Sequence, residues 1–431
     1  MKRSAVVVVV DRLGAGFLGP YGNTWLDTPG FNALASQSFL FEHVLTDSPR
    51  LETVYRSYWQ GLHAMCADVA DAAHRGGSRE SGAGESRESR SPIPLTSRLA
   101  ARGIHTTLIT DEQRLSSLPL ACGFATQTII DPPEVAHPAD DAEETRMAAL
   151  FASAIAQIQS AAAPSLVWLH SRGMAGPWDA PSELRRRWAD EDDPNPPDIT
   201  APPEMRLTEG FDPDELLGYT HAYAGQVSVA DMCVAALIDA VQESTVAADT
   251  MVIFTSPRGY PLGEHQRVGP CDDALYGELL HVPLLVRMPD GTSRTCRSQA
   301  LVQPADIYAT LVDWLLGEND MQLPAAESLL PLVRVERETH RDRACAICNA
   351  QRAIRTPAWF LRETKSDATD SPQVELFAKP DDRWEVNEVT QRCGDMAESL
   401  AKALDDFERA ATSGNWSQMA PLPEMLVESP G

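Results

Sequence analysis

Residues 4–11 read SAVVVVVD, an apolar run without a polar interruption that ends in Asp11. Such a run is typical of a strand covered on both faces, because a strand with one wet face alternates apolar and polar residues. Strands covered on both faces belong to parallel sheets with helices packed on either side. The stretch therefore predicts an α/β fold in which Asp11 stands at the end of an interior strand.

Two segments that follow carry recognisable motifs. Residues 12–23 read RLGAGFLGPYGN, and residues 28–49 read TPGFNALASQSFLFEHVLTDSP. Together they resemble the sulfatase family, whose chains continue from the first strand through L-G-x-Y-G-N and T-P-N to T-S-P and the signature C/S-x-P-S-R-x-x-L-L-T-G. The resemblance implies an α/β, alkaline phosphatase-like fold. It consists of a mostly parallel sheet sandwiched by helices, with a small C-terminal α+β subdomain.

The signature segment sets the register of the comparison. Residues 46–61, TDSPRLETVYRSYWQG, align with T-S-P and the signature without a gap. In this register Leu51 occupies the position of the family's nucleophile, Thr53 that of the proline and Tyr55 that of the arginine. Arg56 lies one place late. The residues that flank the signature match the family, whereas the residues that take part in its chemistry are replaced.

The identity of residue 51 bears directly on the chemistry. The family oxidises Cys or Ser to formylglycine, whose hydrated form attacks sulfur beside a divalent cation. Leucine carries neither oxygen nor sulfur, so the resemblance implies no formylglycine and no catalytic residue at Leu51. Hydroxyls occur at Ser48, Thr53 and Ser57. Each would have to shift by two or more residues, and a displaced nucleophile loses much of its effect.

The family's later metal motif is altered as well. Residues 251–265, MVIFTSPRGYPLGEH, resemble V-I-F-T-S-D-H-G-x-x-L-G-E-H, with Pro257 at the aspartate and Arg258 at the histidine. Of the acids after the first strand Asp11 remains, followed by Arg12. A divalent cation needs several oxygen ligands, so Asp11 alone is insufficient. We expect no metal cofactor, unless a rebuilt site around Asp11 holds Ca²⁺ or Mg²⁺.

A third motif lies in residues 166–181, LVWLHSRGMAGPWDAP, which resemble a strand and loop ending in D-P-H-x-P-aromatic. Gly173, Met174 and Ala175 stand in place of the aspartate, proline and histidine. This segment also keeps its scaffold and loses its ionisable side chains.

A fourth motif lies in residues 103–114, GIHTTLITDEQR, which resemble G-Y-x-T-x-x-x-G-K-W-H. In the family the lysine and histidine of this motif contact the sulfate. Asp111 and Gln113 occupy these positions here. A carboxylate in place of a cation reverses the local electrostatics of an anion site.

The resemblance extends to the C-terminus. Residues 279–291 resemble the family's V-P-L strand, and residues 301–315 a helix that follows it. RAIRTPAWFLRET and VELFAKPDDRWEVNEV resemble a small C-terminal sheet. We therefore divide the chain into a sulfatase-like α/β domain at 1–343 and a C-terminal subdomain at 344–431, with a small antiparallel sheet and a helix.

The overall charge limits the partners. Lys and Arg number 36 against 62 Asp and Glu, a net charge of −26, which disfavours nucleic acid and anionic membranes. No apolar run approaches the length needed to cross a bilayer. The apolar start ends at Asp11 without a small-residue cleavage site, so it does not read as a signal peptide. The 8 cysteines are dispersed, as suits reduced thiols, and we expect a cytoplasmic protein.

Two insertions interrupt the pattern. Residues 73–94 are rich in Gly, Ser, Arg and Glu, and we predict a flexible excursion there. Residues 189–215, ADEDDPNPPDITAPPEMRLTEGFDPDE, are acidic and proline-rich. If this acidic segment contacts a ligand, its charge favours a basic partner over a sulfated one. A solvated surface loop is the simpler interpretation.

Several polar residues remain near the expected ends of strands, where ligands bind in open α/β sheets. Guanidinium groups among them could hold a phosphate or carboxylate in place of a metal. Alternatively, they pair with acids in a filled cleft. Asp11 is the candidate metal ligand; the candidate anion-binding residues are Arg12, Arg56, His170, Arg258 and His265.

Three functional hypotheses follow. In the first, a sulfatase homologue has lost sulfuric ester hydrolysis and acts as a non-catalytic binding or regulatory protein, for an unknown protein or an anionic small molecule. In the second, a metal-dependent hydrolase of sulfate or phosphate esters uses a relocated nucleophile. In the third, a structural or interaction protein uses its acidic insertion. The replacement of the nucleophile and of the cation ligands favours the first and third.

Overall fold

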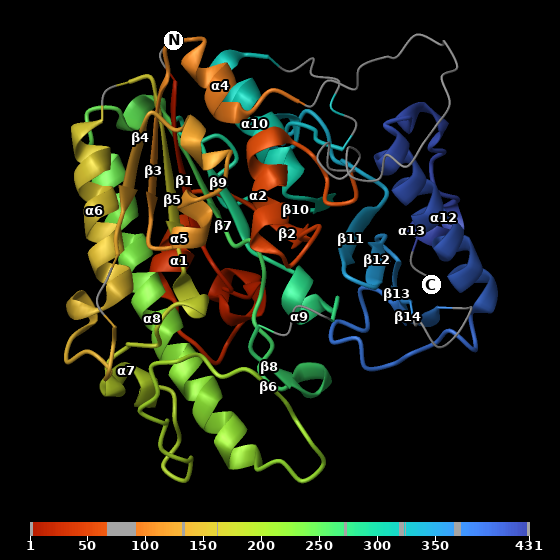
Figure 1. The fold of residues 1–431 in the computed structure, drawn as a ribbon, viewed down its shortest axis with the longest axis horizontal. Coiled ribbons are helices and arrows are strands. Elements are labelled where there is room, and N and C mark those ends of the chain that lie inside the picture. The colour runs from red at the N-terminus through yellow and green to blue at the C-terminus, as the bar shows by residue number, and fades with distance from the viewer. Residues whose placement is uncertain are drawn as a thin grey trace, which may run out of the picture.

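The computed structural model describes residues 3–66, 92–131, 134–161, 163–270, 274–318, 323, 325–365 and 372–428. An eight-stranded sheet forms the centre of the molecule (Figure 1), in the order β10-β2-β9-β7-β1-β5-β3-β4. Its strands are β1 (Ser4–Val10), β2 (Phe39–Val44), β3 (His105–Thr110), β4 (Thr126–Ile129), β5 (Ser165–Ser171), β7 (Thr250–Thr255), β9 (Leu284–Arg287) and β10 (Arg297–Val302).

The first strand lies in the middle of this sheet. β1 pairs in parallel with β5 on one side and with β7 on the other, and Val7 faces Trp168 and Ile253 across the two ladders. β9 runs antiparallel to both of its neighbours, β2 and β7, while the remaining pairings are parallel. The prediction of a mostly parallel sheet is confirmed. The carboxyl ends of all the strands except β9 therefore meet at one edge.

Helices cover both faces of the sheet, as the uninterrupted valine run requires. Val6, Val8 and Val10 pack into one apolar cluster, and Val7 and Val9 into the other. The first face is covered by α1 (Pro29–Ser36), α6 (Arg146–Ser160), α7 (Ser182–Arg186) and α8 (Pro213–Glu243). The second face is covered by α2 (Leu51–Gln60), α4 (Leu95–Ala100), α10 (Ala305–Leu316) and α11 (Leu330–Val333). α5 (Gln113–Ser116) and α9 (Gly277–Leu280) are single turns beside the strands.

The helix α8 is the longest element of the fold. Among the described residues, α8 alone has the length and apolar composition of a membrane span, so the expectation that no run approaches that length does not hold. Its most apolar window is 78% buried within the fold. In the structure it packs as a core helix against α1, α6 and α7.

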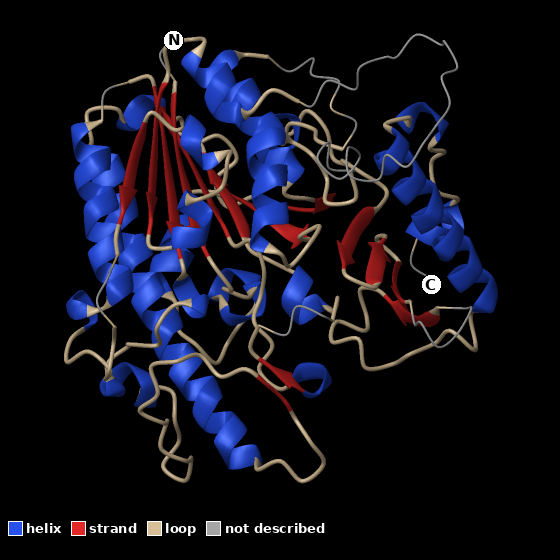
Figure 2. Cartoon of the chain, in the orientation of Figure 1, coloured by secondary structure: helices blue, strands red, loops and turns tan. Residues whose placement is uncertain are grey.

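A second, antiparallel sheet forms the C-terminal subdomain (Figure 2). Its strands are β11 (Ala344–Cys348), β12 (Gln351–Arg355), β13 (Trp359–Thr364) and β14 (Gln373–Ala378). One face packs on α12 (Gly394–Ser413), with α13 (Glu424–Val427) close by. On the other face Phe360 and Phe377 contact Tyr276 and Leu280 of the α/β domain, so the two parts share an apolar cluster.

The two predicted insertions have different outcomes. Most of the stretch 73–94 lies outside the described residues. The acidic stretch 189–215 runs as a loop, forms the short strand β6 (Met205–Arg206) against β8 (Arg267–Val268), and enters α8 at Pro213.

Candidate functional site

Three of the predicted site residues meet at the carboxyl edge of the central sheet. Asp11 follows β1, His170 lies near the end of β5, and Arg258 lies three residues beyond β7. Because β1 is hydrogen-bonded to both β5 and β7, the three segments are neighbours, and the Asp11 backbone N–H donates to Ser171 O at 2.9 Å. The fold therefore places side by side three residues whose convergence the strand ends predict.

Asp11 and Arg258 form a bidentate ion pair. Arg258 Nε donates to Asp11 Oδ1 at 2.9 Å, and Arg258 Nη2 donates to Asp11 Oδ2 at 2.8 Å. Asp11 is fully buried, and the side chain of Arg258 is 12% exposed. Burial alone would raise the pKa of Asp11, but the adjoining guanidinium outweighs it and holds the pKa below its usual range. Both carboxylate oxygens are thus engaged by one cation.

The same guanidinium also reaches the loop before α2. Arg258 Nη1 donates to Pro49 O at 2.7 Å. The cation therefore ties the end of β7 to β1 and to the segment that carries the family's nucleophile position. It lies where the resemblance places a metal ligand, and it supplies a positive charge of its own.

The other two arginines of the predicted set have separate roles. Arg12 is 2% exposed with a φ of 60°, donates from Nη1 to Gly259 O at 3.4 Å, and adds positive potential at Asp11. Arg56, in α2, donates from Nη2 to Cys66 O at 2.9 Å and to Ala64 O at 3.3 Å. Arg12 is part of the Asp11 environment, whereas Arg56 secures the chain beyond α2.

Leu51 is the first residue of α2, is 5% exposed, and packs in the apolar cluster on that face of the sheet. Of the neighbouring hydroxyls, Ser48 Oγ accepts from the Arg50 backbone N–H at 3.3 Å. Ser57 Oγ donates to Asp47 Oδ2 at 2.6 Å. Both serines are buried, so their hydroxyls are engaged within the protein.

Tyr55, at the family's signature arginine, forms a contact that the sequence argument missed. Its hydroxyl lies 2.6 Å from His170 Nδ1, and both residues are fully buried. Burial lowers the pKa of His170 to about 4, although the charge of Asp11 opposes the shift. His170 Nε2 has no hydrogen-bond partner among the described residues. A phenol that contacts a neutral imidazole thus stands at the position of the family's signature arginine, and the aromatic side chains at 55–59 were the available signal.

The residues at the remaining motif positions make hydrogen bonds and close contacts with the neighbouring backbone. Asp111 Oδ1 accepts from the Arg172 backbone N–H at 2.7 Å, and burial raises the pKa of Asp111 to about 6. At Gly173 φ is 50°, and a Cβ atom there would lie 2.5 Å from Asp11 O. Met174 is buried, and its N–H donates to Asp11 O at 2.9 Å. These residues fold the loop after β5 tightly against the end of β1.

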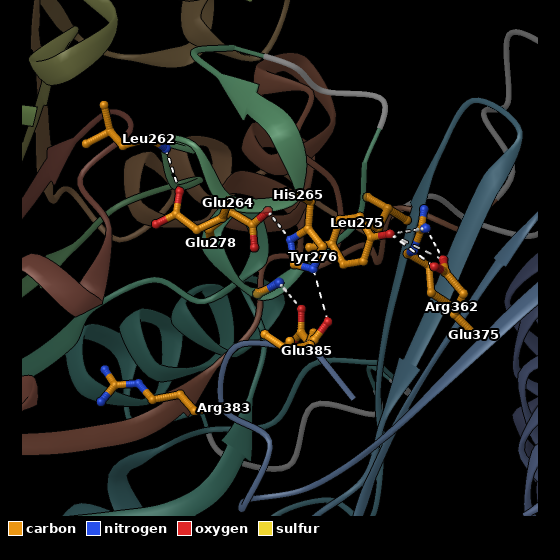
Figure 3. Close-up of polar contacts among 12 residues, drawn as sticks. Leu262, Glu264, His265, Leu275, Tyr276, Glu278, Arg362, Glu375, Arg383 and Glu385 are labelled. Carbon is orange, nitrogen blue, oxygen red and sulfur yellow. Dashed lines mark hydrogen bonds and ion pairs between the residues drawn. The ribbon is translucent and has the colours of Figure 1, made fainter. Parts of the chain in front are cut away.

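His265 lies apart from this group, beside the C-terminal subdomain (Figure 3). Its Nδ1 is 2.9 Å from Glu278 Oε1, its Nε2 is 3.1 Å from Glu385 O, and its ring stacks on Tyr276 at 3.6 Å. Burial opposes protonation, but Glu278 outweighs it and raises the pKa of His265. The structure therefore does not bring His265 to Asp11.

We call the group of Asp11, Arg12, His170 and Arg258 at the carboxyl edge of the sheet the Asp11 edge. The fold family implies a divalent cation here, so we ask whether these side chains could bind one. Ca²⁺ and Mg²⁺ take six or more oxygen ligands. Within the described ranges, no group of three or more His, Cys, Asp or Glu side chains could hold a metal ion. Of the positions after β1 and β7 where the resemblance places metal ligands, Asp11 is the one that carries a carboxylate, and Arg258 engages both its oxygens. These residues do not fit a divalent cation.

Comparison with known proteins bears on the same segments. The Sulfatase family model matches residues 3–318. Arylsulfatase K of Gallus gallus is 26% identical over 231 residues, which cover 50% of this chain and 42% of that protein. N-acetylglucosamine-6-O-sulfatase of Bacteroides thetaiotaomicron is 27% identical over 125 residues, or 29% of this chain and 22% of that protein. The chain spans less than half of the length of either relative in these matches.

Solved structures share the whole architecture. The phosphonate monoester hydrolase of Agrobacterium radiobacter superposes with a TM-score of 0.71 at 17% identity, covering 95% of each chain. A 2-O GAG sulfatase superposes with a TM-score of 0.71 at 16% identity, covering 100% of this chain and 97% of its own. At these identities the likeness concerns the fold. Since the family model covers most of the chain, including every segment that forms the Asp11 edge, the chain belongs to the sulfatase family.

Proposed function

We propose that this sulfatase-family protein has lost sulfuric ester hydrolysis and acts as a non-catalytic binding or regulatory homologue. The observation that carries the proposal is the bidentate pair of Asp11 and Arg258 at the position of the family's cation. A guanidinium already balances the charge of Asp11. A metal would have to displace a cation that is held by two hydrogen bonds to carboxylate oxygens and by a third to Pro49 O.

The nucleophile position supports the same proposal. Leu51 cannot be converted to formylglycine, and its side chain is packed in the core. The nucleophile and the electrostatic stabilisation of the leaving group are ordinarily the largest contributions in such chemistry. We propose that neither formylglycine nor a divalent cation operates here.

Among the described hydroxyls near Leu51, Ser57 gives the relocated-nucleophile alternative its most concrete form, because its Oγ contacts a carboxylate. Ser57 Oγ is 2.6 Å from Asp47 Oδ2, and burial raises the pKa of Asp47 to about 6, which suits a general base. Both side chains are fully buried, however, and Ser57 Oγ also contacts Leu62 O at 2.6 Å. A substrate would need access that the packing does not offer. We therefore favour loss of activity over relocation.

An ester panel tests the proposal. Purified protein is assayed with p-nitrophenyl sulfate, p-nitrophenyl phosphate and a phenylphosphonate monoester, in Ca²⁺, Mg²⁺ or chelator. The phosphonate is included because the solved relatives include a phosphonate monoester hydrolase. We expect no turnover above that of a matched Asp11→Ala preparation. Hydrolysis that survives purification and disappears in Asp11→Ala would overturn the proposal, and loss in Ser57→Ala alone would support relocation.

We also propose a cytoplasmic location and an anionic small molecule or a protein as the partner, with neither nucleic acid nor membrane. The net charge of −26 supports the exclusion of polyanions. The described cysteines are free thiols, as expected for a reducing compartment. Fractionation of cells that produce the full chain would test the location.

A further inference from the structure

A cavity of about 520 Å³ separates the α/β domain from the C-terminal subdomain. This volume is in the range of small-molecule binding sites. Phe17 and Tyr21 line it from the segment after β1, and Phe360 and Trp384 line it from the C-terminal subdomain. None of Asp11, Leu51, Tyr55, His170 and Arg258 lines it. The cavity is therefore distinct from the Asp11 edge.

Arg355 is a buried cation in the wall of this cavity. It is 7% exposed, and its Nη1 donates to backbone carbonyls, Thr356 O, Pro357 O at 3.2 Å and Trp359 O at 3.3 Å. Within the part of the chain that the structure describes, no carboxylate forms an ion pair with it. Burial lowers the pKa of Arg355 to about 10, and the charge of Glu385 compensates only in part. The guanidinium is hydrogen-bonded but lacks a counter-ion.

The other charged groups of the wall are largely matched in pairs. Arg297 Nη1 lies 2.9 Å from Glu42 Oε1, and Lys379 Nζ lies 2.8 Å from Glu385 Oε1. Glu278 is matched by His265, as Figure 3 shows.

Two cations and one carboxylate of the wall remain. Arg355 and Arg383 have no ion pair among the described residues. Figure 3 draws Arg383 apart from the hydrogen-bonded cluster. Glu264 accepts from the Leu262 N–H at 2.6 Å, and burial raises its pKa. The charged side chains that line the cavity thus comprise four cations and four carboxylates, and among the described residues Arg355 is the buried cation of this set that has no ion pair.

Two histidines, His43 and His281, also line the cavity near Arg355. Burial lowers the pKa of His281 to about 4 and also lowers that of His43, and the charge of Arg355 acts in the same direction on both. His43 Nδ1 is 3.0 Å from Gln299 O, and His281 Nε2 is 2.7 Å from Glu42 O. Both rings are therefore neutral near pH 7, and they add polarity to the Arg355 side without adding charge.

The wall on the C-terminal side is held in place by a connected cluster. Glu385 Oε2 accepts from the Gly277 N–H at 2.7 Å, and Tyr276 stacks between His265 and the guanidinium of Arg362, whose carbon lies 4.0 Å from the ring centroid. The segment after β14 is thereby fixed to α9 of the α/β domain. A cavity between fixed walls binds without a large ordering cost.

We propose that this cavity binds a small organic monoanion with a flat apolar body. The anionic group is balanced by Arg355 and Arg383, and the body lies against Phe360 and Trp384. A single negative charge matches the buried guanidinium of Arg355, which has no ion pair among the described residues, and the four carboxylates of the lining disfavour polyanions. The proposal does not depend on whether the Asp11 edge is catalytic.

The test uses benzoate and benzenesulfonate as probes, with benzamide as the neutral isostere and phenyl phosphate as the dianion. Binding to the full-length protein is measured by calorimetry at constant ionic strength and by tryptophan fluorescence. We expect saturable one-to-one binding of the two monoanions, weaker binding of the dianion and none of benzamide. The fluorescence change should vanish in Trp384→Phe, since Trp384 lines the cavity.

Substitutions of the two arginines complete the test. Arg383→Gln changes an exposed side chain, and we expect about tenfold weaker benzoate binding from the loss of one charged contact. Arg355→Lys keeps the charge and removes the guanidinium fork, with at least the same expected loss. Arg187→Gln, an exposed arginine at the end of α7, is the matched control and should bind as the wild type does.

Three results would overturn the proposal: no binding of either monoanion, benzamide binding as tightly as benzoate, or wild-type affinity in both arginine variants. If circular dichroism shows that Arg355→Lys does not fold, the Arg383→Gln comparison decides alone.

Discussion

The Asp11 edge and the cavity beside the C-terminal subdomain contain the same kinds of groups in opposite states. At the Asp11 edge the guanidinium of Arg258 faces a carboxylate at 2.8–2.9 Å, and the residues around it are packed. In the cavity the guanidinium of Arg355 borders open volume, and its hydrogen bonds among the described residues go to backbone carbonyls. Polar residues near strand ends therefore indicate a ligand site only where their charges are not already balanced by other side chains of the protein. This contrast between the two regions leads to predictions that differ in size.

Removal of Arg258 should have the largest effect. Arg258→Ala leaves Asp11 buried without its partner, and breaking a buried pair on one side costs about 3–5 kcal/mol of unfolding free energy. In the wild type the pKa of Asp11 is lowered from 3.8, so its contribution is present above that value and is lost as pH falls through the folded pKa. Without the guanidinium, burial raises the pKa of Asp11 in the variant, so protonation relieves the unpaired charge as pH falls. The stability deficit of Arg258→Ala, measured by urea denaturation, should therefore be greatest near pH 7 and shrink as pH falls through that raised pKa.

The matched control removes both charges together. Asp11→Asn combined with Arg258→Met should recover much of the stability lost in Arg258→Ala, because no unpaired charge remains. If Arg258→Ala unfolds at the wild-type urea concentration at pH 7, the ion pair does not hold this edge together.

His170 should give the second effect, as a dependence of stability on pH. The pKa of His170 falls from 6.5 in the unfolded chain to about 4 in the fold. Because the unfolded chain binds a proton at His170 more readily than the fold does, the unfolding free energy is highest above pH 6.5. It should fall by up to about 3 kcal/mol as pH falls from 6.5 toward 4. His170→Gln, which keeps a polar partner for Tyr55, should lose less stability over that range. Identical pH profiles for the variant and the wild type would contradict the assignment.

Restoring a thiol at the nucleophile position should have a smaller effect. Leu51→Cys removes buried apolar volume and should cost about 1–2 kcal/mol, while Leu51→Met should cost less, since it keeps the volume. We expect no ester hydrolysis by Leu51→Cys, even if mass spectrometry shows formylglycine, because Arg258 still occupies Asp11. Turnover in this single variant would mean that the cation position is functional.

The smallest effect on stability should come from a substitution in the wall of the cavity. Arg383→Gln changes an exposed side chain and should alter the unfolding free energy by less than about 0.5 kcal/mol. Its expected loss lies in benzoate affinity instead. A large destabilisation by Arg383→Gln would show that this arginine serves the fold, and it would remove the contrast with Arg258.

The sequence predicted the fold well and the arrangement of polar groups less well. The run at residues 4–11 and the motifs after it predicted the central strand and the sheet, because apolar patterning is local. The strand ends also predicted that Asp11, His170 and Arg258 are neighbours. Which group a side chain hydrogen-bonds depends on the direction in which that side chain points, and the spacing of residues along the sequence does not specify this direction. The sequence therefore did not predict that Tyr55 meets His170, or that His265 turns to Glu278.

The cavity could not be predicted from the sequence at all. Its lining comes from segments separated by more than 300 residues, such as Phe17 and Trp384. Arg355 lies in a motif that resembles the family's small C-terminal sheet, and nothing in the neighbouring letters shows that its guanidinium lacks a carboxylate. Such a feature appears only when the two domains are placed together.

Calorimetric titration of Ca²⁺ and Mg²⁺ into metal-stripped protein tests directly whether Arg258 has replaced the family's cation. Asp11 is already neutralised by Arg258, so we predict no heat of specific binding up to millimolar metal, in the wild type or in Asp11→Asn. One-to-one binding that disappears in Asp11→Asn would contradict the account. It would mean that the cation site of the family still operates at this edge of the sheet.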